Sequence, residues 1–175
     1  MKKLTTVVFK PEWVNEGVGA KVVRVLGNQH IRRLDPFLML DYFHVKLPGG
    51  FPDHPHRGFE TVTYMLEGEV AHEDFKGHKG VIGPGDIQWM TAGKGIVHSE
   101  MPTSFTVTSK GFQLWLNLKA SNKMINPRYQ ELKAAEIPIV KKQNMSVKVI
   151  AGEWEGVKGP IQVETPSYYF DVHFH

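Results

Sequence analysis

The sequence predicts an all-β domain, a barrel or sandwich of short strands with one short helix and a C-terminal strand extension. Runs of β-branched and aromatic residues recur between turn signals at spacings of roughly 8–12 residues, as in proteins of this class. The 17 glycines and 11 prolines among 175 residues favour many turns. The hydrophobic share of 41% and the charged share of 22% are typical of a folded globular chain, which can bury a core without disulfides.

The strand candidates of the first two thirds of the chain follow one another with short turns between them. Residues 21–26 are rich in valine, and residues 34–43 surround Pro36, which predicts an edge or irregular strand. Residues 111–118 alternate leucines with polar or aromatic side chains, so their two faces differ. The full set comprises residues 4–9, 21–26, 34–43, 59–66, 70–75, 80–82, 87–91, 96–101 and 111–118.

Two segments are expected to interrupt the strands. Residues 46–56 predict a structured loop, because the three prolines and two glycines within them forbid a helix. Residues 128–135 predict the one helix, since Asn126 suits an N-cap and Pro127 suits the first helical position. The remaining strand candidates are residues 146–150, 161–163 and 168–175.

The composition excludes several classes of function. With no cysteine, the chain has no disulfide scaffold, no zinc ribbon and no thiol nucleophile. The net charge of +3 comes from scattered or paired lysines and arginines, which favours a solvated surface over direct nucleic-acid binding. Residues 1–10 lack the apolar core of a signal peptide, and no run approaches the roughly 18 apolar residues of a membrane span. These features predict an intracellular, cytoplasmic protein without a membrane partner.

Three histidines and a glutamate form the strongest chemical signal. His54 and His56 stand two residues apart, as do His98 and Glu100, so on extended strands each pair projects to one side. Pro55 stiffens the first pair. Either pair alone is a weak signal, but each follows a glycine-rich turn region in a β chain. If the two strands are neighbours, three imidazoles and a carboxylate converge and leave two positions of an octahedral ion open, as in non-haem iron sites.

Two motifs then carry a family resemblance. The first reads Gly50-x3-His54-x-His56-x3-Glu60 and is followed by Gly68, and the second reads Gly85-Asp86-x6-Gly93-x4-His98. Both resemble the motifs of cupins. The longer stretches GGFPDHPHRGFETVTYMLEGEVAHEDFKGH and PGDIQWMTAGKGIVHSEMP resemble the pirin family, and the resemblance runs from about residue 16 to near the C-terminus. It implies the cupin fold, a double-stranded β-helix or jelly-roll barrel.

The resemblance also implies a metal and its ligands. Pirins hold iron with three histidines and one glutamate, which match His54, His56, His98 and Glu100 in this chain. In many other cupins the ligating carboxylate belongs to the first motif, so Glu60 is the alternative ligand. A ligand set of this kind accepts Fe(II) or Fe(III) and also Mn, Co, Ni, Cu or Zn.

Pirins usually contain two cupin domains, which predicts how this chain divides. Residues 1–125 would form the metal-binding cupin barrel. Residues 126–175 would form a short helix, connecting strands and the start of a second cupin domain that is absent. Because that domain would normally cover part of the first, we expect exposed apolar surface near residues 168–174 and a homodimer through this C-terminal edge.

The resemblance supports two main hypotheses of function. Similarity to quercetin 2,3-dioxygenases implies an oxygenase that cleaves flavonol-like aromatic substrates with dioxygen. The metal would lower the pKa of the substrate hydroxyl, and Glu100 or Glu60 would accept its proton. Similarity to eukaryotic pirins, which are also nuclear, implies instead an iron-dependent redox-sensing transcriptional coregulator that binds a transcription factor or a metabolic enzyme without turnover. A third hypothesis is an inactive cupin fragment with an empty or zinc-filled site.

Other residues near these motifs have weaker interpretations. Asp53 and Arg57 flank the first histidine pair and would orient the imidazoles or contact an anionic substrate. Gln113 is a candidate to support a ligand, whereas His72 and His78 are expected to be surface or turn histidines. The candidates for a pocket mouth, with core packing as the alternative, are Phe51, Trp89 and Met90.

Overall fold

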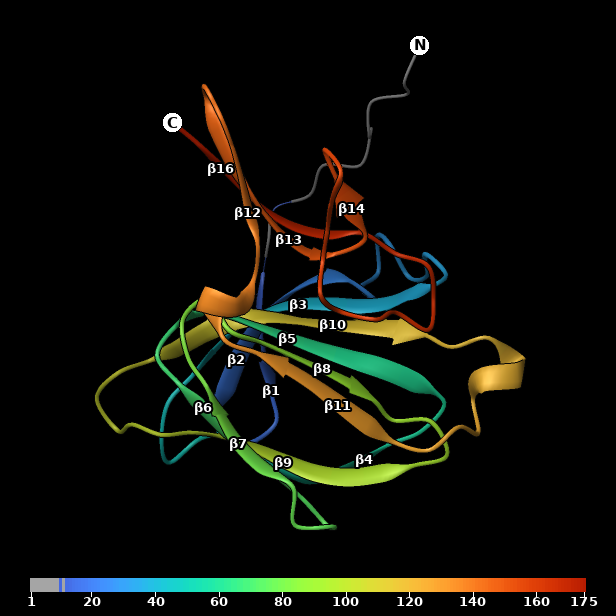
Figure 1. Ribbon diagram of the computed structural model, residues 1–175. Helices are drawn as coiled ribbons and strands as arrows, with labels where there is room; N and C mark the ends of the chain where they lie inside the picture. The colour runs from blue at the N-terminus through green and yellow to red at the C-terminus, as the bar shows by residue number, and fades with distance from the viewer. Residues whose placement is uncertain (1–9, 11) are drawn as a thin grey trace.

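The computed structural model describes residue 10 and residues 12–175, so the strand predicted at residues 4–9 lies outside it. Two antiparallel sheets face each other to form a barrel, which confirms the all-β prediction (Figure 1). The larger sheet runs, in order of hydrogen-bonded neighbours, β1 (Trp13–Glu16), β2 (Ala20–Leu26), β3 (Phe37–Val45), β10 (Ser109–Asn117), β5 (Phe59–Glu67), β8 (Ile87–Thr91) and β11 (Arg128–Leu132). The smaller sheet runs β4 (Phe51–His56), β9 (Ile96–Pro102), β6 (Val70–Asp74) and β7 (Lys79–Ile82).

The C-terminal part of the chain packs on the outer face of the larger sheet (Figure 1). It forms a three-stranded sheet, β12 (Ile139–Lys142), β13 (Met145–Ala151) and β16 (Tyr169–Phe174), and a small hairpin, β14 (Glu153–Trp154) and β15 (Val157–Lys158). The helical segments of the described residues are two short 3₁₀ turns, η1 (Ala120–Asn122) and η2 (Ala134–Glu136). No described helix is long and apolar enough to cross a membrane.

Both faces of β5 and β8 in the larger sheet are buried, and they differ in chemistry. Alternate residues such as Val62 and Trp89 join one apolar cluster with Ile150 from the C-terminal part. Inside the barrel there are two separate apolar clusters, one around Met65 and one around Met90. Between these clusters, the paired positions of β5 and β8 carry threonine and glutamine, so the middle of the barrel is polar.

The loop predicted for residues 46–56 is wrong in its second half, where Phe51–His56 is strand β4. This strand lies at the edge of the smaller sheet, and among the described strands it pairs with β9 alone, from Phe51 opposite Glu100 to His56 opposite Ile96. An edge strand tolerates proline because its outer side needs no amide donors. The ladder also shifts register between Phe51 and His54.

The helix predicted for residues 128–135 is also wrong. Arg128–Leu132 is strand β11, which pairs with β8 in unbroken register, and a 3₁₀ turn follows at Ala134–Glu136. The Asn126-Pro127 signal marks the start of a strand here, because pairing satisfies the amides along the open edge of β8. Residues 161–163 form no strand, and Ile161 makes a single bridge to Ala151.

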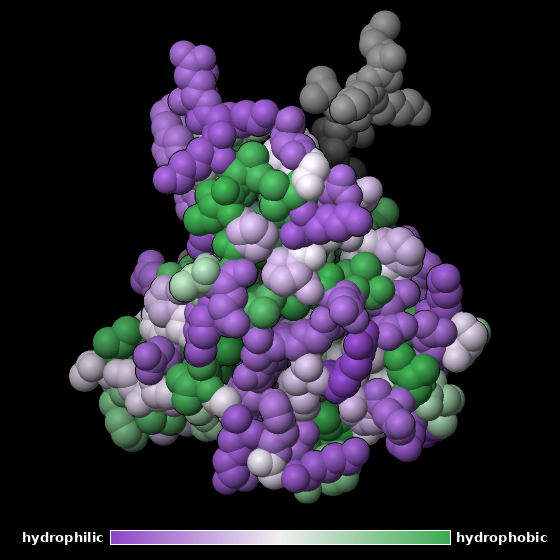
Figure 2. Space-filling model, viewed as in Figure 1, coloured by the Kyte–Doolittle hydropathy of each residue, from purple (hydrophilic) through white to green (hydrophobic). Residues whose placement is uncertain are grey.

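Exposed apolar side chains occur near residues 168–174, as predicted. Tyr168 is 71% exposed and Phe174 is 80% exposed. Next to Tyr169, an apolar cavity of about 330 Å³ opens against the outer face of the barrel. Figure 2 shows apolar side chains gathered near the junction of this part with the barrel. The homodimer and the division of the chain at residue 125 stay predictions, and β11 continues the barrel sheet beyond that residue.

Candidate metal centre

Strands β4 and β9 bring the three predicted histidines together. His54 lies directly opposite His98 in the antiparallel ladder, and His56 lies two residues along β4 on the same side. The ring centroids are 4.6 Å apart for His54 and His98, 4.7 Å for His54 and His56, and 5.0 Å for His56 and His98. One ligand nitrogen of each ring lies within 4.8 Å of those of the other two.

Each histidine of this cluster has a ring nitrogen that is free for a ligand. Nδ1 of His54 lies 2.8 Å from the carbonyl oxygen of Pro52 and must donate to it, which leaves the lone pair on Nε2. Nε2 of His56 and both ring nitrogens of His98 are buried and have no hydrogen-bond partner. Because an unpaired buried polar atom costs free energy, the unpaired nitrogens of His56 and His98 beside Nε2 of His54 fit a bound metal ion.

The protonation state of the buried rings favours the same conclusion. Burial, together with the neighbouring His98 and His54 rings, lowers the pKa of His56 to about 3. Burial likewise lowers the pKa of His98 to about 3, with His54 and His72 adding to the effect. Both imidazoles are therefore neutral at neutral pH, the form that binds a metal.

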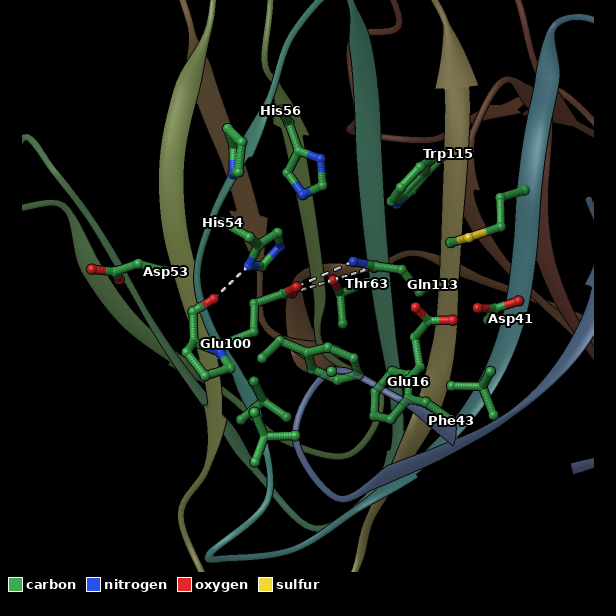
Figure 3. Close-up of a pocket in the computed structure, with 18 of the residues that line it drawn as sticks. Glu16, Asp41, Phe43, Asp53, His54, His56, Thr63, Glu100, Gln113 and Trp115 are labelled. Carbon is green, nitrogen blue, oxygen red and sulfur yellow. Dashed lines mark hydrogen bonds between the residues drawn. The ribbon is translucent and has the colours of Figure 1, made fainter. Parts of the chain in front are cut away.

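Glu100 faces the same cavity but is held apart from the histidines. Thr63 Oγ1 donates to Oε1 of Glu100 at 2.9 Å, and Gln113 Nε2 donates to Oε2 at 3.2 Å (Figure 3). Its carboxylate is outside the group of nitrogens that lie within 4.8 Å of one another. Gln113 therefore contacts the predicted ligand Glu100, as expected from the sequence, and Thr63, which no sequence motif marks, does the same.

Glu60 is not brought to the histidines. It lies on the same face of β5 as Val62 and Tyr64, which belong to the outer apolar cluster, whereas Thr63 faces the cavity. The Glu60 side chain is fully buried and accepts a hydrogen bond from Thr91 at 2.7 Å. Burial raises the pKa of this carboxyl. The structure thus separates the two candidate carboxylates by the thickness of the sheet.

The histidines border a cavity of about 530 Å³ between the two sheets. Phe51, Phe43 and Trp115 form apolar walls, and the Trp115 ring lies 5.3 Å from that of His56. At the far side, Arg24 pairs with Glu16 and Asp41 at 2.8 Å each. Sequence reasoning missed Trp115 and this ion-pair cluster, although the alternation of residues 111–118 places Trp115 on the same face as Gln113.

Some of the other residues considered from the sequence line the cavity, and others do not. Asp53 borders the cavity, but its side chain points away from the imidazoles in Figure 3. Arg57 is exposed and donates to the sulfur of Met124. Of the three candidates for a pocket mouth, Phe51 lines the cavity. Trp89 and Met90 pack in the core instead.

The prediction for His72 is wrong, since this ring is only 3% exposed. Strand β6 lies between β9 and β7, so its inward residues are covered by the larger sheet. His78 lies at the turn before β7 with a side chain that is 45% exposed, as predicted.

Known proteins resemble this chain in sequence. The Pirin family model matches residues 19–116. The chain is 54% identical over 171 residues to human Pirin, and the match covers 97% of this chain and 58% of that protein. The chain spans little more than half the length of the curated relatives it matches first.

Solved structures resemble it in fold. A quercetin 2,3-dioxygenase from Acinetobacter baumannii matches with a TM-score of 0.82 and 35% identity, over 92% of this chain and 60% of that one. The bacterial pirin YhhW from Escherichia coli, in complex with nickel(II), matches with a TM-score of 0.65 and 25% identity, over 79% of this chain and 67% of that one. These neighbours confirm the cupin-type barrel.

Proposed function

The chain belongs to the pirin family, and on that premise we propose that it is a metal-dependent oxygenase of the quercetin 2,3-dioxygenase type, acting on flavonol-like aromatic substrates. The observation that carries the proposal is the set of unpaired ring nitrogens of His54, His56 and His98 at the wall of a cavity of about 530 Å³. That volume is within the usual range for small-molecule sites. The similarity to a quercetin 2,3-dioxygenase supports the same reaction class.

In this proposal the three histidines hold the ion, and Glu100 is the fourth ligand. Nitrogen and oxygen donors without a thiolate suit iron, and they also suit Mn, Co, Ni, Cu or Zn. The nickel(II) complex of YhhW supports a divalent ion in this family. When bound, the ion supplies Lewis acidity that lowers the pKa of a hydroxyl group on the substrate.

Glu100 is the proposed acceptor of the proton from that hydroxyl. Thr63 has one hydroxyl proton and two acceptors within reach, Oε1 of Glu100 at 2.9 Å and Oε1 of Gln113 at 2.7 Å. When this hydroxyl turns to Gln113, Oε1 of Glu100 becomes free to take the proton of the substrate. Gln113 keeps the other carboxylate oxygen in place meanwhile.

The cavity walls fit a flat aromatic molecule with hydroxyl groups at its edges. Trp115 and Phe51 offer ring faces and apolar surface near the histidines. At the far side, the carboxylates of Glu16 and Asp41 offer acceptors for hydroxyl protons, and Arg24 balances their charge.

The test is oxygen consumption with quercetin by the iron-loaded protein. We expect oxygen uptake that disappears in the His54→Ala/His56→Ala double variant, because that variant loses two of the three nitrogen donors. His173→Gln, on an exposed strand, is the matched control and should keep full uptake. Equal uptake by the double variant and the intact chain would refute the proposal.

A second candidate function is redox-dependent protein binding. The observation that favours it is the place of the cluster on β4, an edge strand whose Asp53 and Pro55 are exposed. A change from Fe(II) to Fe(III) would add one unit of charge directly beneath this surface. The measurement is the affinity for a protein partner in each oxidation state without turnover, and equal affinities would exclude this function.

A further inference from the structure

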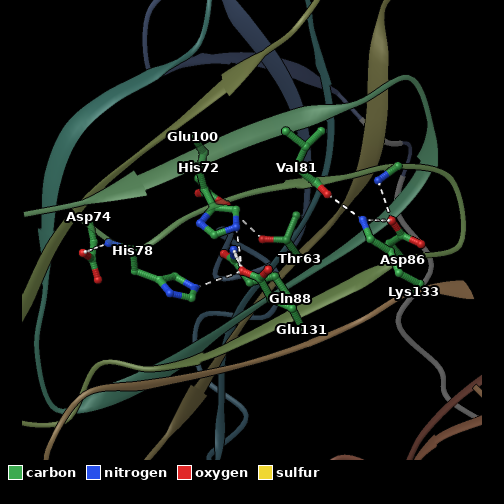
Figure 4. A network of polar contacts seen from close by, with 11 residues as sticks. Thr63, His72, Asp74, His78, Val81, Asp86, Gln88, Glu100, Glu131 and Lys133 are labelled. Carbon is green, nitrogen blue, oxygen red and sulfur yellow. Dashed lines mark hydrogen bonds and ion pairs between the residues drawn. The ribbon is translucent and has the colours of Figure 1, made fainter. Parts of the chain in front are cut away.

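A second cluster of ligand-type side chains lies inside the same barrel, next to Glu100, which is opposite His72 in the β6–β9 ladder. His72 comes from β6, His78 from the turn before β7, and Glu131 from β11 (Figure 4). One ligand atom of each lies within 4.8 Å of those of the other two. Nε2 of His72 is 2.6 Å from Oε1 of Glu131, and Nε2 of His78 is 3.5 Å from the same oxygen.

His72 carries the main argument, because its ring is 3% exposed and lacks hydrogen bonds. Both Nδ1 and Nε2 are buried without a hydrogen-bond partner. The short contact between Nε2 and Glu131 therefore lacks hydrogen-bond direction. An imidazole nitrogen and a carboxylate oxygen this close must share a cation, which is either a proton on Nε2 or a metal ion that takes its place.

The neighbouring residues hold the cluster in place. Gln88 Nε2 donates to Oε1 of Glu131 at 2.9 Å, and the Tyr129 ring stacks on His78 at 4.4 Å between centroids. Gly80 lies opposite His72 in the β6–β7 ladder, where a Cβ atom would collide with Nε2 of His72 and lie 2.8 Å from Oε2 of Glu131. Glycine at this position thus leaves room for the two groups to meet.

The charge of the cluster suits a cation. Two imidazoles and one carboxylate make the ligand set of several zinc sites, which keep a fourth position open for water.

We propose that His72, His78 and Glu131 form a second metal site that binds Zn²⁺ or a similar divalent transition ion. Ligand atoms of a tetrahedral zinc ion are about 3.3 Å apart, given bonds of roughly 2.0–2.1 Å. The 3.5 Å separation of His78 and Glu131 already matches this value, and the 2.6 Å contact of His72 needs to open by a fraction of an ångström. Since the His78 side chain is 45% exposed, solvent reaches the edge of this cluster.

The experiment measures Zn²⁺ uptake by the chelator-treated chain, by equilibrium dialysis against zinc alone. We expect two equivalents for the intact chain. His78→Gln and Glu131→Gln, which change partly exposed residues and avoid the buried His72, should each bind one. The His54→Ala/His56→Ala variant should also bind one, and combining it with His78→Gln should abolish uptake.

His173→Gln is the matched control for binding by an exposed histidine beside a carboxylate. It should keep two equivalents. One equivalent in the intact chain, or a second equivalent that survives His78→Gln and Glu131→Gln, would overturn the proposal. Co²⁺ gives an independent measurement, because a tetrahedral second site adds visible absorption that His78→Gln should remove.

Discussion

The two histidine clusters of the barrel differ in their origin and in their access. The first takes all three histidines from the neighbouring strands β4 and β9 and opens on a cavity that is large enough for an aromatic substrate. The second takes its groups from β6, a turn and β11, and it borders no such cavity in the described structure. The two clusters hold similar donors, but among the described residues the cavity adjoins the three histidines of the first.

The largest expected effect is on the stability of the metal-free chain in acid, to which the two clusters contribute differently. In the metal-free chain, the pKa values of His56 and His98 lie near 3, well below the ordinary value of 6.5. Below pH 6.5 these two histidines bind protons in the unfolded chain but not in the folded chain. The free energy of unfolding therefore decreases as the pH is lowered. At pH 5.5 the loss is about 1.4 kcal/mol for each ring, or about 3 kcal/mol in total.

The measurement is urea denaturation of the chelated protein between pH 7 and pH 5. The His56→Gln/His98→Gln variant should lose this pH dependence. Glu131 at the second cluster does not contribute to the pH dependence between pH 7 and pH 5. Its depressed pKa of about 2 affects stability only as the pH falls below the ordinary carboxyl value of 4.5. An unchanged pH dependence in the double variant would contradict the prediction.

A smaller effect isolates the second cluster by thermal unfolding. In the His54→Ala/His56→Ala background, Zn²⁺ at 100 times its Kd should stabilise the fold by about 2.7 kcal/mol, which raises the Tm by about 5–10 °C. Adding His78→Gln should remove the shift. If the Tm still rose by the same amount in that triple variant, the zinc would be binding elsewhere.

The smallest effect concerns the support of Glu100 at the first cluster. Gln113→Ala removes the donor to Oε2, so oxygen uptake with quercetin should fall by about 10–100-fold while the metal content stays unchanged. Gln29→Ala, at an exposed position, should have no effect. Equal losses in both variants would show that Gln113 has no special role.

Much of the first cluster could be predicted because its geometry is local. A spacing of two residues on an extended strand places His54 beside His56 and His98 beside Glu100, whatever else the chain does. The second cluster has no such pattern, since His72 and Glu131 come from strands that are far apart in sequence. Only the pairing of β11 with β8, where a helix was expected, brings Glu131 into the barrel.

The sequence by itself determined the all-β class, most strand positions and the three histidines, because these depend on local periodicity and on turn residues. Tertiary structure alone decided which carboxylate shares the cavity with them, since Glu60 and Thr63 differ only in the face of β5 they occupy. It also decided that residues 128–132 are a strand and that His72 is buried. Such outcomes depend on which edges and faces meet in space, and local sequence signals do not carry that information.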